Sequence, residues 1–133
     1  MTSTTTAALR FLRILSALVL LATGGIHLFL VFDGVGGILG VMFVLNAVAA
    51  VVLAVGMMLL RGRILQIASV LSLLFLLATL GALLLALTVG LFGITEVWTF
   101  TLVPQTVVVE SIGIVVLAVT TVLMLRSASP ARR

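Results

Sequence analysis

The sequence predicts an all-α fold, a bundle of four transmembrane helices. Of its 133 residues, 64% are hydrophobic and only 8% are charged, about a third of the charged share of a typical soluble domain. The apolar residues form long continuous runs, and the arginines stand at the ends of those runs. So few charges cannot cover a protein surface in water. We therefore expect lipid to be the solvent for most of the chain.

The apolar runs are long enough to cross a bilayer, which takes about twenty residues for a ~30 Å hydrocarbon core. In lipid the backbone must satisfy its own hydrogen bonds, so a continuous run predicts a helix, whereas a barrel strand would alternate. The expected spans cover roughly residues 10–32, 37–60, 64–90 and 104–126. Together they form a single transmembrane domain over residues 1–133.

The two ends of the chain carry no apolar run. The first eight residues read MTSTTTAA and the last seven read SASPARR. Neither stretch can bury enough apolar surface to fold alone. We expect disorder over residues 1–8 and 127–133.

The charges are distributed unequally between the two sides of a four-span topology. All the basic residues precede the first span, separate the second from the third or follow the fourth, whereas Asp33 and Glu96 fall in the other two connections. The positive-inside rule then predicts a bacterial inner-membrane protein with both termini in the cytoplasm. Five arginines are expected to anchor in lipid headgroups: Arg10, Arg13, Arg61, Arg63 and Arg126. Because the basic residues lie at helix ends and not on one folded face, nucleic acid is not an expected partner.

A stripe of small residues recurs every four positions along the third expected span, at Ala78, Ala82, Ala86 and Gly90. Such stripes let membrane helices approach closely. Two interpretations stay open, namely packing inside the bundle and contact in a homo-oligomer. A larger membrane partner is a further possibility.

The connection before the fourth span contains the single tryptophan, Trp98, two residues after Glu96. Interfacial aromatic residues commonly mark the headgroup boundary. The alternative is a segment that folds over the outer mouth of the bundle as a lid, with Glu96 and Trp98 in it.

Two ionisable residues, His27 and Glu110, lie inside the expected spans, with Asn46 as a neutral companion at a compatible depth. Such side chains are costly in lipid and usually face a bundle interior. Helical spacing puts His27 on a stripe with Ser16 and Thr23, and a second polar stripe contains Glu110. We expect His27, Asn46 and Glu110 to meet inside the bundle.

Four roles remain open for this group. It can form a buried hydrogen bond that fixes helix register, handle protons or ions, bind a ligand or lipid headgroup, or hold a metal or haem. Three side chains are few ligands for zinc, and haem would have one axial histidine only. No metal site is therefore predicted, and no cofactor is indicated.

The stretches GGIHLFL, GGILGVMFVLNAVAAVVLAVGMML, GLFGITE and VVVES, in this order, resemble small four-span membrane proteins of actinobacterial type. The resemblance covers roughly residues 14–125. In length and span order the chain also resembles the DoxX-like four-helix membrane proteins. Either resemblance implies a four-helix membrane bundle and assigns no functional residue.

The sequence contains no motif of a soluble enzyme, neither a phosphate-binding glycine loop after a strand nor HExxH. We expect a non-enzymatic membrane protein, either an accessory subunit or a bundle that binds a small molecule or lipid in an outward-facing polar pocket. The alternatives are a proton-coupled transporter or channel and a cofactor-bearing redox protein.

Overall fold

The computed structural model describes residues 3–128 as four helices with short connections. The helices are α1 (Ser3–Phe32), α2 (Gly37–Leu59), α3 (Gly62–Thr88) and α4 (Val103–Ala128). Each is long and apolar enough to cross a membrane. Over the described residues, the only β contact is an isolated bridge between Leu91 and Ile94. The prediction of an all-helical, four-helix fold is confirmed.

The helix ends lie within two residues of the expected boundaries except at the start of α1. α1 begins at Ser3, so the expected disorder over residues 1–8 is wrong for residues 3–8. No Gly or Pro interrupts this lead, and extending an existing helix adds about one hydrogen bond for each residue fixed. α3 ends at Thr88 because Gly90 takes a left-handed conformation (φ +84°), with its N–H 2.9 Å from the Leu85 carbonyl.

The expected disorder over residues 127–133 is wrong at its start, since α4 continues to Ala128. The remainder of that prediction, at 129–133, and residues 1–2 lie outside the described part of the chain.

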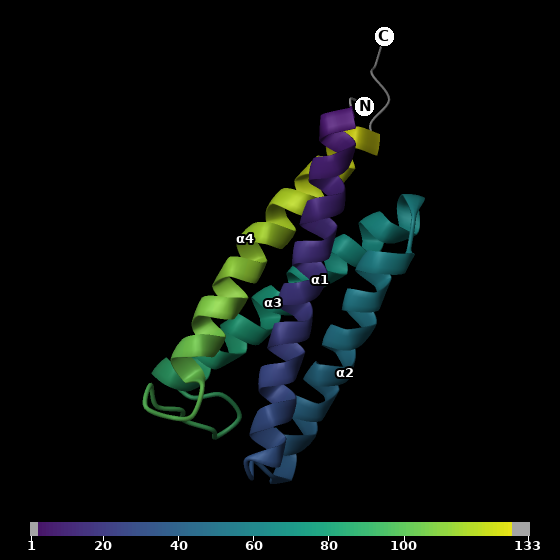
Figure 1. Cartoon of the computed structure of the whole chain (residues 1–133). Coiled ribbons are helices and arrows are strands. Elements are labelled where there is room, and N and C mark those ends of the chain that lie inside the picture. Colours follow the sequence, from purple (N-terminus) through teal and green to yellow (C-terminus); the bar gives the residue numbers. More distant parts are fainter. Residues whose placement is uncertain (1–2, 129–133) are drawn as a thin grey trace.

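The helices form two pairs that meet at one end and diverge at the other (Figure 1). α1 packs extensively on α2, and α4 packs on both α3 and α1, while contact between α2 and α3 is sparse. The first described residue, the end of α4 and the 60–61 turn lie at one end of the bundle, which we call the terminal end. The connections 33–36 and 89–102 lie at the other, the loop end. The gap between the pairs therefore widens from the terminal end toward the loop end.

The core contains one long, fully buried side chain from each helix. These are Leu20, Met57, Leu76 and Leu117, each 0% exposed. All four side chains belong to a single hydrophobic cluster. Because each helix contributes to this cluster, the helices are held together without a separate hydrophobic core for each pair.

Small residues set the closest helix approaches. A Cβ placed on Gly24 of α1 would lie 2.9 Å from the Cβ of Ala50 in α2. A Cβ on Gly113 of α4 would overlap Val19 of α1 and would lie 2.5 Å from a methyl group of Leu76 in α3. These contacts put Gly113 at a crossing of three helices, where no larger residue fits without a shift.

Polar contacts hold the terminal end together. The Thr121 hydroxyl of α4 lies 2.7 Å from that of Ser69 in α3, and both are buried. The Arg13 guanidinium of α1 donates hydrogen bonds to the carbonyls of Met57, Met58 and Leu60, at 2.9–3.1 Å. The last carbonyls of a helix have no partner within it. Arg13 therefore caps the end of α2 from the neighbouring helix, in addition to the headgroup contact expected of it.

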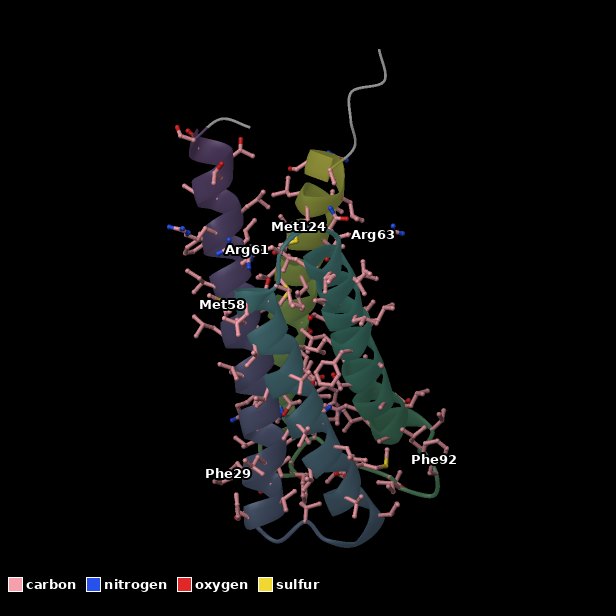
Figure 2. All side chains as sticks on the ribbon, turned by 90° about the vertical axis from the view of Figure 1, so that its right-hand side faces the viewer. Phe29, Met58, Arg61, Arg63, Phe92 and Met124 are labelled. Atoms are coloured by element: carbon pink, nitrogen blue, oxygen red, sulfur yellow. The ribbon has the colours of Figure 1, made fainter. Side chains whose placement is uncertain are left out.

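The outer surface of the bundle is apolar. Large hydrophobic side chains are exposed on all four helices, and Figure 2 shows Phe29, Met58 and Phe92 pointing away from the bundle. Arg61 and Arg63 lie at the terminal end, at about the same level along the bundle as Met124 of α4 (Figure 2). The segregation of basic residues to one end, expected from the sequence, is thus a feature of the folded chain over the described residues.

Candidate functional site

A cavity of about 290 Å³ lies between the diverging helix pairs at the loop end. α2 and α3 supply most of its helical wall, segment 89–102 supplies another wall, and α1 and α4 contribute fewer residues, among them His27, Thr106 and Glu110. The lining is mainly apolar, from residues such as Leu39, Met42, Phe43, Phe75 and Leu83. Three expected site residues, His27, Asn46 and Glu110, all line this one cavity.

His27 is held in a defined orientation by α1 and α2. Its ring nitrogen Nδ1 lies 2.9 Å from the backbone carbonyl of Thr23, one turn earlier in α1. Since a carbonyl only accepts, Nδ1 must carry the proton, and Nε2 is then the acceptor in a neutral ring. The Phe43 ring packs edge-on against the imidazole, with centroids 4.9 Å apart and an interplanar angle of 90°. These contacts fix the ring and leave Nε2 as its remaining polar atom.

Glu110 is the most unusual residue of the cavity. Its side chain is 0% exposed, and neither carboxyl oxygen has a hydrogen-bond partner among the described residues. Thr79 of α3 lies on the same cavity wall, but its hydroxyl donates to the Leu76 carbonyl at 3.1 Å. A buried polar group without a partner costs about 1–3 kcal/mol, and more when it is charged. The fold therefore bears an electrostatic cost at Glu110, which the nearby Thr79 hydroxyl offsets only in part because its proton is directed to the Leu76 carbonyl.

Asn46 repeats this pattern on α2, since its Oδ1 is buried without a partner within residues 3–128. The expectation that His27, Asn46 and Glu110 meet is thus met in part. They share a cavity, yet no hydrogen bond joins any two of them in the described structure. No group of three His, Cys, Asp or Glu side chains suited to a metal occurs among the residues described.

The polar stripes expected on α1 and α4 do face the interior. Ser16, Thr23 and His27 are all buried, as are Thr106 and Glu110. The Thr106 hydroxyl donates to the Leu102 carbonyl at 2.7 Å and lines the same cavity. Helical spacing therefore located the inward faces correctly.

Segment 89–102 folds back over the end of α3. The Glu96 N–H donates to the Ala86 carbonyl at 2.9 Å, and Leu91 and Ile94 exchange two backbone hydrogen bonds of 2.8 Å. Glu96 lines the cavity. Trp98 is 54% exposed and, of the two residues expected in a lid, is the one that does not line the cavity. This placement agrees with an interfacial tryptophan.

The stripe of small residues on α3 has an unexpected neighbour. Ala78, Ala82 and Ala86 line the cavity, so this face of α3 borders open space and not a tightly packed helix of the same chain. The small side chains contribute to the volume of the cavity. Sequence reasoning did not identify Phe43, Phe75 or Thr79 as lining residues, because nothing in their spacing distinguishes them from other inward-facing positions.

Comparison with known proteins adds no relative to these observations, since no family model, no curated protein and no solved structure matches the chain. The site must be interpreted from its own chemistry.

Proposed function

We propose that this protein is a non-enzymatic, four-span protein of a bacterial inner membrane that binds a small amphiphilic molecule or lipid in its cavity. The carrying observation is Glu110, a fully buried residue of the cavity lining whose carboxyl oxygens have no hydrogen-bond partner among the described residues. The mainly apolar walls with a few polar groups have the character of a small-molecule site. At about 290 Å³ the cavity is close to the lower end of the size range for such sites.

A purely structural role for the polar group fits less well. Side chains that fix helix register do so by bonding to one another, and His27, Asn46 and Glu110 do not. Replacing an unsatisfied buried carboxyl by an apolar group of similar shape costs nothing in hydrogen bonds. A ligand that donates to Glu110 explains why a carboxyl is suited to this position.

Native mass spectrometry of the protein, extracted gently from its own membrane, tests the proposal. We expect a bound lipid or small molecule on the wild type, and its loss from Ala82→Phe, which fills the cavity. Leu77→Phe is the matched control, because Leu77 is exposed on the same helix. Bare wild-type protein would contradict the binding function, whereas the mass of an additional polypeptide would favour an accessory subunit.

The proposed topology places the terminal end, with its arginines, in the cytoplasm and the cavity near the outer face. The chain contains no cysteine, so single cysteines can be introduced directly. Both Thr95, at the loop end, and Ser127, at the terminal end, are exposed. An impermeant thiol reagent added to intact cells should label Thr95→Cys and leave Ser127→Cys unlabelled until the membrane is opened. The reverse pattern would invert the orientation.

A proton-coupled transporter is the second candidate, favoured by the presence of both His27 and Glu110 in one cavity. Transport of this kind requires Glu110 to change protonation during turnover. In proteoliposomes, Glu110→Gln should then abolish substrate uptake driven by a pH gradient. If wild type and Glu110→Gln take up the substrate equally at every pH, the assignment as a proton-coupled transporter is wrong.

A further inference from the structure

We propose that the cavity selects lipophilic molecules with a protonated amine headgroup and admits them sideways between α2 and α3. This inference rests on the binding function proposed above and names its ligand class. It follows from the kind of polar atoms in the cavity, from their charge and from the position of the opening.

Of the three threonine hydroxyls in the cavity lining, those of Thr79 and Thr106 offer acceptors only. Thr79 and Thr106 each donate their single proton to a backbone carbonyl of their own helix or its first turn, Leu76 O at 3.1 Å and Leu102 O at 2.7 Å. A hydroxyl with its proton already used retains only lone pairs. Neither threonine can donate to a ligand without first breaking a local bond.

Most of the remaining polar atoms are acceptors, the NH2 group of Asn46 being a donor. Glu110 contributes two carboxyl oxygens and Asn46 one amide oxygen, all buried without partners. His27 uses its Nδ1 proton on the Thr23 carbonyl, which leaves Nε2 as an acceptor in the neutral ring. A ligand that satisfies these atoms must supply several N–H or O–H donors from one group. A protonated primary amine has three donors.

The charges of the lining have one sign. Glu96 and Glu110 line the cavity, whereas no arginine of residues 3–128 does. A buried carboxylate is strongly stabilised by a cation at hydrogen-bond distance, and an anionic headgroup would add a like charge in a low-dielectric site. The geometry thus favours an ammonium group over a phosphate or carboxylate.

The opening faces sideways. Met42 of α2 and Ala78 of α3 line the cavity and are also exposed, as are Phe92 and Thr101 of segment 89–102, so we place the opening between α2 and α3 beside this segment. α2 and α3 make little contact with each other, and they diverge toward the loop end (Figure 1). The bulk of the ligand would lie against Leu39, Met42 and Leu83, with its amine directed to Glu110.

Four adamantane derivatives with the same apolar cage provide the test: aminoadamantane, adamantyltrimethylammonium, adamantanol and adamantanecarboxylate. Saturable binding of tritiated aminoadamantane is measured on the wild-type protein in zwitterionic nanodiscs, with the other three as competitors and empty nanodiscs as background. We expect the amine to bind about tenfold or more tightly than the alcohol or the carboxylate, because charged hydrogen bonds are the strongest available here. The trimethylammonium, which has the charge but no donor, should lie between them.

Variants then locate the interaction. Glu110→Gln should weaken binding of the amine by about tenfold or more and leave the alcohol unchanged. Asp33→Asn, the same change at an exposed loop-end carboxylate outside the cavity, should have no effect. If Glu110→Gln does not fold, Ala82→Phe serves in its place and should reduce binding of all four compounds.

The outcomes separate this inference from the proposed function. Binding of the alcohol or carboxylate as tight as that of the amine would overturn the headgroup selectivity and leave the binding function standing. Equal affinity for the trimethylammonium would overturn the hydrogen-bonding requirement. No saturable binding of aminoadamantane would refute the inference, and the binding function would fail as well only if the protein from its own membrane is also bare.

Discussion

The hydroxyl pair that links α3 to α4 provides a quantitative test of the fold. Ser69 and Thr121 lie 2.7 Å apart and are 0% and 6% exposed. The described structure gives neither hydroxyl a second partner. The single substitutions Ser69→Ala and Thr121→Val, together with the double variant, complete a cycle that isolates this bond.

Interhelical hydrogen bonds in membrane proteins contribute about 0.6 kcal/mol on average and up to about 1.7 kcal/mol. The Ser69–Thr121 bond is short and buried, so we expect a coupling energy in the upper part of this range, about 1–1.7 kcal/mol. This coupling energy is well below the full cost of an unpaired hydroxyl in an apolar medium. A hydroxyl whose partner has been removed can rotate and donate to a backbone carbonyl of its own helix.

A second pair, one residue away on α4, serves as the control. Ser16 and Thr120 lie 3.2 Å apart, but their hydroxyls already contact the carbonyls of Leu12 and Val116 at 2.8 and 2.7 Å. Each hydroxyl has one proton. If both protons go to these carbonyls, none remains between the two oxygens. The cycle of Ser16→Ala and Thr120→Val should therefore be additive within about 0.5 kcal/mol.

Both cycles can be measured by reversible unfolding of the purified protein with increasing SDS in mixed micelles. Coupling is the departure of the double variant from the sum of the single variants. Equal couplings in the two cycles, or a larger coupling for Ser16 and Thr120, would refute the assignment of protons from these distances.

Three further predictions concern stability, each measured by thermal unfolding in the same micelles. Gly113→Ala should destabilise the bundle by about 1–3 kcal/mol because it overfills a three-helix crossing, whereas Gly81→Ala, with open space around its Cβ, should be neutral or slightly stabilising. Arg13→Gln should cost about 1.5–3 kcal/mol through loss of the charged bonds that cap α2, and Arg10→Gln, at an exposed position, should cost less than about 0.5 kcal/mol. Glu110→Met should stabilise the protein by about 1 kcal/mol or more, since it removes an unpartnered buried carboxyl; a lower melting temperature would show that the carboxyl has a partner.

The helices were predictable because their signal is local. Long apolar runs ending at arginines predict membrane-length helices from length alone, and the four observed helices coincide with those runs to within a few residues at all but the first boundary. That boundary, at Ser3, was not predicted because the threonines of the lead are weak helix formers, and nothing in the sequence indicates that the helix continues through them. Orientation of the polar stripes followed from helical spacing and was correct for Ser16, His27 and Glu110.

The cavity was not predictable in the same way, because it depends on how helix pairs diverge. Ala78 and Ala82 have the spacing of a packing surface, and the same spacing equally produces a smooth cavity wall. Whether a stripe meets a helix or open space is decided by the neighbouring helices, not by α3 itself. The lack of hydrogen-bond partners for Glu110 likewise depends on side chains from other helices. The sequence around Glu110 does not determine how those side chains are oriented.

The position of the cavity follows from the small residues that precede it. Gly24, in close contact with α2, lies one helical turn from His27, and Gly113, at the three-helix crossing, lies one turn from Glu110. Small residues draw the helices together at this level, and longer polar side chains fit one turn farther on because the pairs have begun to separate there. The closely packed layer therefore lies one helical turn from the polar residues of the cavity, on the side of the terminal end. Close packing at the crossing fixes the polar side chains at a constant depth. The sparse contact between α2 and α3 leaves the path to these side chains open.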